Sequence, residues 1–319
     1  MDKRTLVKCG ASSFNVAVPI DWVRKHKLEK GSEVSIEENE RGELVLSAGC
    51  EPVALQQNHH TIKINSESSR LLYWELLRAY LRNYTSINLE GENISLLAGP
   101  ELQKLNSFIG LDIIERTKKV VVLKNFSAKD TETSPYLLVK KLDVGVRAMI
   151  EMIKAFFSEG FSQERVLELQ SQHEYNERIY LFALKGINNA IDTPALMRVF
   201  KTDYKQLMQE YELIRSLRQI SSNLAKMGNL LLFVEHKSKG GKLFNEMFDD
   251  ICEKYLVVLT FPKNNLSKEI LELLNSSKTK TSVWESSMKD IKVQPLVELF
   301  IYGIAINNAL DQLALELMG

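Results

Sequence analysis

The pattern of apolar and polar positions changes twice along the chain, and each change indicates a different kind of structure. Over residues 1–48, short apolar or alternating runs are separated by glycines, a pattern typical of strands joined by turns. The expected strands are residues 5–7, 14–18, 33–37 and 43–46. Only the segment after Pro19, residues 20–27, fits a helix, of about two turns. The pattern predicts a small β-rich domain.

Residues 60–126 alternate between strand and helix patterns. The expected strands are 61–64, 86–90, 112–116 and 120–123, with helices at 67–82 and 100–109. Alternation of this kind indicates a small α/β domain. We expect the last two strands to form a hairpin across residues 117–119.

From residue 134 to the end the period is helical. One apolar stripe steps by three or four residues through Leu138, Leu142, Val146, Met149, Ile153 and Phe156. A second stripe runs from Val166 to Ala190 and places His173 and Asn176 at inward positions. A third helix is expected to begin at Pro194, behind a capping Asp192 or Thr193, and to carry its stripe to Val234. Stripes of this length predict a long-helix bundle.

A shorter helical set follows this stripe. Residues 236–242 are basic and contain glycine, so we expect a connector there. Helices are expected at 243–259, 267–274 and 293–318, and the polar segment 276–292 is expected to be a loop. The predicted fold class is multidomain α+β. Its parts are a β-rich domain (1–48), a small α/β domain (60–126) and an all-α bundle (134–319).

Composition narrows the cellular setting. Of the 319 residues, three are cysteines, Cys9, Cys50 and Cys252, and this odd, scattered set favours free thiols in a reducing compartment. No segment has the features of a secretory signal or of a transmembrane helix. We therefore expect a cytoplasmic protein without membrane insertion.

Charge is balanced overall, with 41 basic and 41 acidic residues, but it is polarised within the first domain. Residues 1–27 carry a net +4, with Asp2 and Asp21 as the acids, and residues 28–43 carry a net −4. The basic residues are Lys3, Arg4, Lys8, Arg24, Lys25 and Lys27. Such a face predicts contacts with DNA phosphates. The alternative is a solvated face that complements the acidic segment.

The first domain also has too little apolar surface to bury a core of its own. We therefore expect a homodimer or a higher homo-oligomer that forms by strand exchange. Its core would contain Phe14, Val16, Val18, Leu28 and Val34.

Residues 8–46 resemble the AbrB/SpoVT-type swapped-hairpin DNA-binding domain. The resemblance rests on Gly10, Ser12-Ser13-Phe14, Val18-Pro19, Trp22-Val23, Leu28, Lys30-Gly31 and Glu33-Val34. It implies an intertwined dimer that presents basic residues from paired hairpins to DNA.

Residues 60–235 resemble archaeal-type proteins that join such a domain to a PhoU-like bundle. The carrying segments are 72–83 (LYWELLRAYLRN) followed by Ile87, 142–156, 174–180 (EYNERIY) and 211–231 (YELIRSLRQISSNLAKMGNLL). The resemblance implies a role in regulating phosphate uptake, with a phosphate transporter or signalling proteins as further partners.

The chain departs from the PhoU-like pattern where that family carries paired carboxylates for metal. His173 with Glu177, and Arg218 with Ser222, stand at these positions, and Tyr302 and Ile306 stand in the last helix. We therefore expect no metal in the bundle, with His173 and Glu177 as the weak candidates. The alternative for His173 is an inward histidine that is hydrogen-bonded to neighbouring helix groups.

The common nucleotide-binding, zinc-protease and serine-hydrolase motifs are absent, so we expect no catalytic residue, no cofactor and no enzymatic activity. The leading hypothesis is a cytoplasmic DNA-binding regulator of phosphate homeostasis. The first alternative is a PhoU-like signalling adaptor that binds a transporter or kinase without binding DNA. The second is a metal-dependent enzyme that uses His173 and Glu177.

Overall fold

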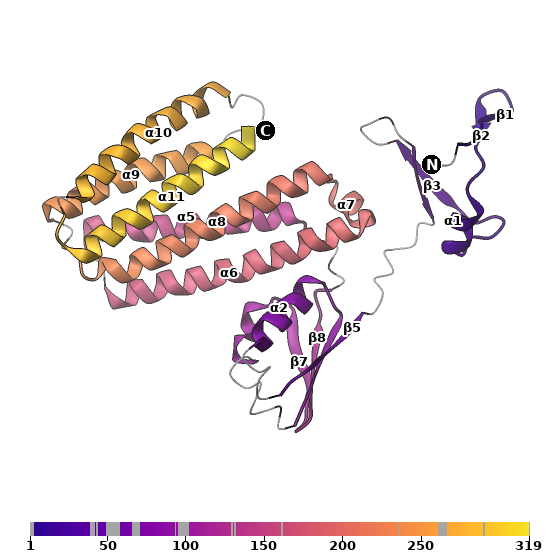
Figure 1. The fold of residues 1–319 in the computed structure, drawn as a ribbon, viewed down its shortest axis with the longest axis horizontal. Helices are drawn as coiled ribbons and strands as arrows, with labels where there is room; N and C mark the ends of the chain where they lie inside the picture. The colour runs from indigo at the N-terminus through magenta and orange to yellow at the C-terminus, as the bar shows by residue number, and fades with distance from the viewer. Residues whose placement is uncertain are drawn as a thin grey trace. The chain divides into compact units, whose positions relative to one another are not determined.

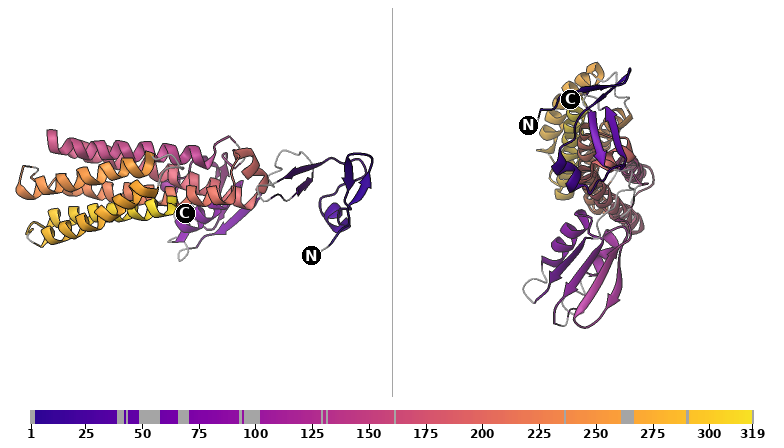
Figure 2. Two further views of the ribbon diagram at one scale, coloured as in Figure 1. Left: turned by 90° about the horizontal axis from the view of Figure 1, so that it is seen from above. Right: turned by 90° about the vertical axis from the view of Figure 1, so that its right-hand side faces the viewer.

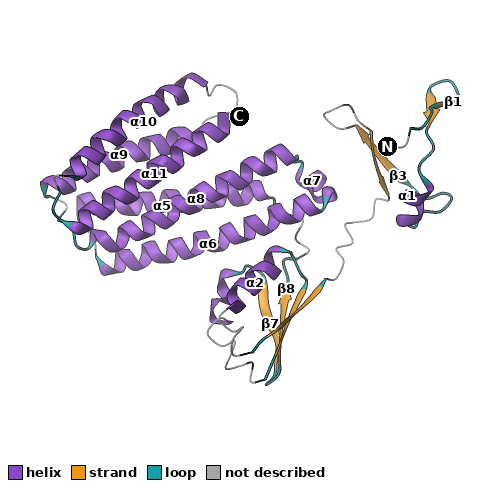
Figure 3. Cartoon of the chain, viewed as in Figure 1, coloured by secondary structure: helices purple, strands orange, loops and turns teal. Residues whose placement is uncertain are grey.

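The computed structural model is a mixed α+β protein with a β-rich N-terminal region and a helical C-terminal region (Figures 1 and 3). The structure describes residues 3–38, 42, 44–48, 58–65, 71–92, 94, 102–128, 130, 132–160, 162–235, 237–260, 267–289 and 291–318. Contacts divide the chain into two units, Met1–Gln56 and Gln57–Gly319.

The N-terminal unit consists of two antiparallel strand pairs and one short helix. Strand β1 (Val7–Cys9) pairs with β2 (Ser13–Asn15), and β3 (Val34–Glu38) pairs with β4 (Leu44–Ala48). Between the pairs, α1 (Ile20–Lys25) follows Pro19.

Several expected boundaries in this unit were wrong: the strand expected at 14–18 ends at Asn15, and the strand expected at 43–46 continues to Ala48. The first strand was expected at 5–7, but β1 reaches Cys9 because Gly10, at φ +77°, makes the turn that pairs Cys9 with Ser13. The helix was expected to reach residue 27, but it ends at Lys25. Lys27 has a φ of 50°, which is incompatible with a right-handed α-helix.

The second unit begins with a four-stranded sheet in the order β5-β6-β8-β7. Strand β5 (His59–Lys63) runs parallel to β6 (Ser86–Glu90), and α2 (Leu72–Leu81) makes the crossover between them. Strands β7 (Leu111–Arg116) and β8 (Val120–Asn125) form an antiparallel hairpin, which confirms the expected one. Residues Ile87, Leu89, Val121 and Leu123 on one sheet face and Leu72, Leu76, Ala79 and Tyr80 on α2 are buried.

The helix expected at 100–109 is only one 3₁₀ segment, η2 (Gln103–Ser107), among the described residues; positions 100 and 101 lie outside them. Phe108 leaves the helical region and packs its ring 5.1 Å from that of Tyr80. Gly110 then turns the chain at φ +80°. Burial of Phe108 against α2 therefore ends the helix early. Of the helix expected at 67–82, residues 67–70 lie outside the described part of the chain.

Six long helices form the bundle. Helices α5 (Pro135–Glu159), α6 (Gln163–Asp192) and α8 (Tyr204–Leu231) pack on one another. Helices α9 (Lys239–Thr260), α10 (Ser267–Met288) and α11 (Gln294–Met318) form a second set, which contacts the first mainly through α11 and α8 (Figure 2). The stripe predicted on α5, from Leu138 to Phe156, is buried throughout.

Side-chain caps explain where the helices of the first set begin. Ser134 accepts a hydrogen bond from the backbone N–H of Leu137, and Ser162 accepts one from that of Arg165. The expected single helix from Pro194 to Val234 is two helices, α7 (Pro194–Phe200) and α8. Lys201, at φ 53°, breaks the helix, and the Asp203 carboxylate caps a new one at the N–H of Gln206. Thr193 holds the N-cap position of α7 without a side-chain hydrogen bond.

The expected connector 236–242 is largely helical, because α9 begins at Lys239. The Ser238 hydroxyl accepts a hydrogen bond from the backbone N–H of Gly241 and so caps the first turn of α9. Gly240 is required by packing rather than by flexibility, since a Cβ there would lie 2.1 Å from Cδ2 of Leu296. Position 236 itself lies outside the described residues.

The expected loop at 276–292 was also wrong, since α10 continues to Met288. Most polar residues of this segment are exposed, but Ser277 is buried and completes a hydrogen-bonded network with the neighbouring helices. The Lys254 ammonium of α9 donates to the Ser277 hydroxyl at 2.8 Å, to the Asn307 amide oxygen at 2.8 Å and to the Asp311 carboxylate at 2.5 Å. This network holds the one buried polar residue described in this segment against α9 and α11.

Replacing Lys254 by Met should destabilise the protein by about 2–4 kcal/mol, because it leaves the Asp311 carboxylate and the Asn307 amide without their buried donor. Urea unfolding followed by circular dichroism measures the change. Lys280→Met is the matched control, because Lys280 pairs with Asp250 near the surface and the change should cost less than about 1 kcal/mol. Equal losses in the two variants would contradict a structural role for the network.

A second buried lysine joins the bundle to the sheet. Lys185 of α6 is 3% exposed, and its ammonium donates to the Ser127 hydroxyl at 2.6 Å and to the Asn125 amide oxygen at 3.3 Å, next to the end of β8. The same nitrogen lies 4.7 Å from the ring centroid of Tyr80. Burial lowers the pKa of Lys185 from 10.5 to about 7, against the opposing attraction of Asp130.

This shift makes stability depend on pH with a definite sign. Between pH 7 and 10.5 the unfolded chain keeps a proton on Lys185 that the folded chain releases, so stability should rise with pH through this window. Lys185→Met should reduce that slope by up to about 1.4 kcal/mol per pH unit. Urea titrations at several pH values test this, with Lys140→Met, on the exposed face of α5, as the control. An unchanged slope in Lys185→Met would refute it.

Candidate functional site

The six basic residues predicted to contact DNA are all exposed. Arg24 and Lys25 lie together in the last turn of α1, and Lys27 follows that helix. Lys8 lies on a different element, β1, and Lys3 and Arg4 precede it. Asp2, one of the two acidic residues in the net charge of +4 for residues 1–27, lies outside the described residues. Glu40, Arg41 and Glu43 of the acidic segment also lie outside them.

The described side chains of the N-terminal unit form no buried core within one chain. Of residues 3–36, 42, 44–46 and 48, none is buried, and Phe14 and Leu44 are 61% and 72% exposed. Val16 is also exposed, while Val18, Leu28 and Val34 are half-buried. Exposed apolar side chains at this density favour association, because their transfer out of water is a main source of folding free energy.

Phe14→Asp should therefore convert a dimer of the full chain into monomers, because it places a charge where the apolar side chain would be buried. Sedimentation velocity at micromolar concentration measures the change. Val144→Asp is the control, since Val144 of α5 is equally exposed, at 66%, but lies outside this unit. A dimer that survives Phe14→Asp and is lost in Val144→Asp would place the interface on the bundle instead.

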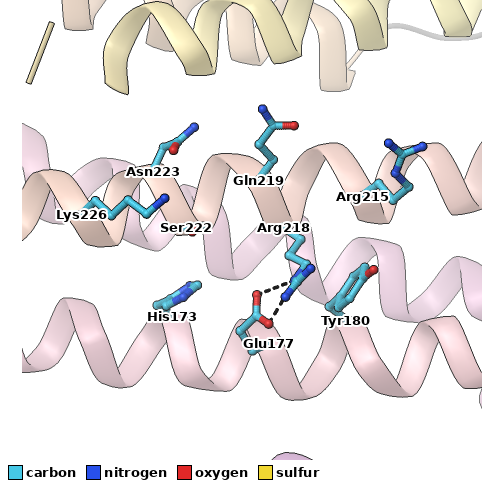
Figure 4. Close-up of a pocket in the computed structure, with 9 residues that line it drawn as sticks. All are labelled: His173, Glu177, Tyr180, Arg215, Arg218, Gln219, Ser222, Asn223 and Lys226. Carbon is cyan, nitrogen blue, oxygen red and sulfur yellow. Dashed lines mark hydrogen bonds and ion pairs between the residues drawn. The ribbon is translucent and has the colours of Figure 1, made fainter. Parts of the chain in front are cut away.

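His173 and Glu177, the weak metal candidates, lie one turn apart on α6 and face α8 across a cleft of about 560 Å³ (Figure 4). Nδ1 of His173 lies 3.0 Å from the hydroxyl of Ser221 on α8. This contact agrees with the alternative for His173, an inward histidine that is hydrogen-bonded to a neighbouring helix. Both oxygens of Glu177 accept from Nε of Arg218, at 2.8 and 3.0 Å. Protein groups already bind both candidates.

The electrostatics of this cleft disfavour a cation. Burial is the main cause that lowers the pKa of His173, the Glu177 carboxylate opposes it, and Arg218 adds to the lowering. Within the described ranges, no three His, Cys, Asp or Glu side chains come together as a set that could hold a metal ion. His173 and Glu177 therefore fit a metal ion poorly.

Sequence reasoning identified Arg218 and Ser222 in this cleft but missed Arg215 and Lys226, which also line it. The spacing of residues 218, 222 and 226 is the signal that could have found them, because positions four apart lie on one helix face. The cleft is therefore a stripe of basic and polar side chains on α8 facing a short acidic and histidine stripe on α6.

The cysteines offer little chemistry. Cys9 is exposed on β1, and Cys252 is buried in α9, where burial raises the pKa of its thiol to about 12. Both are free thiols, and Cys50 lies outside the described residues. Among the described helices, none has the length and apolar content needed to cross a bilayer.

No protein-family model, curated protein or solved structure matches the chain.

Proposed function

We propose that the protein is a homodimeric, DNA-binding transcriptional regulator of phosphate uptake, with an AbrB/SpoVT-type N-terminal domain and a PhoU-like sensing bundle. One observation carries the proposal. The N-terminal unit combines exposed basic side chains with apolar side chains that a single chain leaves unburied. A second copy would cover the apolar residues and double the basic surface.

The physical basis for DNA binding is the release of counterions. Each phosphate neutralised by a lysine or arginine frees condensed cations, so affinity falls steeply as salt rises. Lys8 on β1 and the Arg24–Lys25 pair at the end of α1 would be contributed twice in a dimer. Phosphate contacts set affinity and register, and any contact to a base edge adds sequence preference.

The double variant Lys8→Ala/Arg24→Ala should weaken binding of the full-length protein to duplex DNA. If each side chain contacts a phosphate, the slope of log affinity against log salt should become shallower by about 0.9 for each lost contact. Fluorescence anisotropy of a labelled duplex over a salt series measures both quantities. A base-edge contact would instead cost roughly 1–3 kcal/mol on a preferred sequence.

Lys30→Ala is the matched control, because Lys30 lies in the acidic half of the same unit. It should leave the affinity and the slope nearly unchanged. A folded dimer whose double variant binds DNA with wild-type affinity and slope would refute the DNA-binding role. That result would favour the signalling adaptor that docks on a transporter or kinase without DNA.

A further inference from the structure

The cleft between α6 and α8 has an excess of positive charge. Three permanent cations line it, Arg215, Arg218 and Lys226, against one carboxylate, Glu177. With His173 neutral, the lining carries a net +2, which is three cations minus one anion. Figure 4 shows Lys226 and His173 at one end of the cleft, Arg215 at the other and the Arg218–Glu177 pair between them.

The arrangement is regular because both helices contribute residues one turn apart. On α8, Arg218, Ser222 and Lys226 share one stripe that spans about 12 Å along the axis. On α6, Glu177 and His173 form the facing stripe. Arg218 is fixed at the middle of the cleft, since its guanidinium also lies 4.6 Å from the ring centroid of Tyr180.

Several donors in the cleft have no acceptor among the described residues. Within the described residues, the Lys226 ammonium has no carboxylate within 4.0 Å, and its only ring contact there is Tyr302, at 5.5 Å. In the same part of the chain, neither the Ser222 hydroxyl nor the Asn223 amide makes a side-chain hydrogen bond, although Asn223 is only 6% exposed. Unused donors beside surplus positive charge indicate a site for an anion.

A purely structural role accounts for only some of the basic side chains that line the cleft. The Arg218–Glu177 pair links α6 to α8, and Arg215 has its own partner in Glu212, at 3.0 Å. Among the residues that the structure describes, Lys226 has no such carboxylate partner, and it repeats the positive charge of Arg218 on the same helix face. Like charges on one face are unfavourable unless a counter-charge lies between them.

We propose that this cleft binds a phosphate group, which sits over Ser222 between Arg218 and Lys226 and faces His173. Arginine and lysine supply charge-assisted hydrogen bonds, and the serine hydroxyl supplies a neutral donor. The volume of the cleft, about 560 Å³, admits either free phosphate or the phosphate of a small organic molecule.

Glu177 gives the site a preference among oxyanions. A carboxylate has about four acceptor positions, and Arg218 Nε engages only part of them. The free positions can accept the P–O–H proton of hydrogenphosphate, whereas sulfate carries no such proton at neutral pH. The site therefore favours phosphate over sulfate.

Isothermal titration calorimetry on the full-length protein tests this inference, with inorganic phosphate, adenosine monophosphate and sulfate titrated at matched ionic strength. Phosphate or the nucleotide should bind, and sulfate should bind more weakly. Binding by the nucleotide alone would support the site and identify its source as an organic phosphate. Equal binding of sulfate would overturn the assignment to phosphate, and the absence of binding by all three would overturn the site.

Two variants with matched controls localise the binding. Lys226→Met should weaken it about tenfold, the effect of losing one charge-assisted hydrogen bond, whereas Lys268→Met on the exposed face of α10 should not. Ser222→Asp should abolish it by placing a negative charge where the ligand sits, and Ser282→Asp should not. Unchanged affinity in both cleft variants, with helical content intact, would overturn the proposal.

The inference rests on α6 and α8 and not on DNA binding. The two claims can fail separately, because DNA affinity is measured on the same wild-type and variant proteins. Wild-type phosphate binding without DNA binding would remove only the regulatory function, and DNA binding without phosphate binding would remove only this site.

Discussion

Inward polar side chains of long helices must find partners on the neighbouring helices, and this requirement fixes the bundle. Side-chain hydrogen bonds between α6 and α8 link Gln170 with Asn229, His173 and Asn176 with Ser221, and Glu177 with Arg218. As the α6 partner advances along the chain, the α8 partner recedes, so the pairs set an antiparallel register. A slip by one turn would separate every pair, and apolar packing by itself penalises such a slip much less.

The same requirement draws α5 close to the other two helices. The Asn176 amide donates to the Ser221 hydroxyl at 3.1 Å and contacts the sulfur of Met149. A Cβ at Gly145 would lie 2.0 Å from the Asn176 amide oxygen, so only glycine fits there. Glycine inside a helix costs about 1 kcal/mol relative to alanine, and the buried hydrogen bonds that it permits offset this cost.

Much of the architecture follows from the sequence because it depends on local periodicity. The stripe of α5, the strand at 86–90 and the hairpin of β7 and β8 are all found where their patterns indicate. The failures have two causes: a tertiary contact that outweighs a local signal, and a single residue at positive φ that ends an element. Ser277 is polar yet buried beside Lys254, and Lys201 breaks a helix whose apolar stripe continues on both sides.

The candidate cleft was only partly predictable for a related reason. His173, Glu177, Arg218 and Ser222 were singled out as departures from a metal-binding pattern. Their contacts depend on which helices become neighbours, and the register of α6 against α8 is not encoded in either helix taken separately. Lys226 lies two turns beyond Arg218 and becomes significant only when His173 is placed opposite it.

The N-terminal unit, which buries none of its described residues within one chain, has a consequence for gene dosage. When a domain folds only on pairing, the population of the competent form rises with the square of chain concentration at low abundance. A twofold change in synthesis would then alter the amount of paired domain about fourfold. Cells would thereby obtain a response that is steeper than linear in chain concentration, and unpaired chains would present apolar side chains to proteases and chaperones.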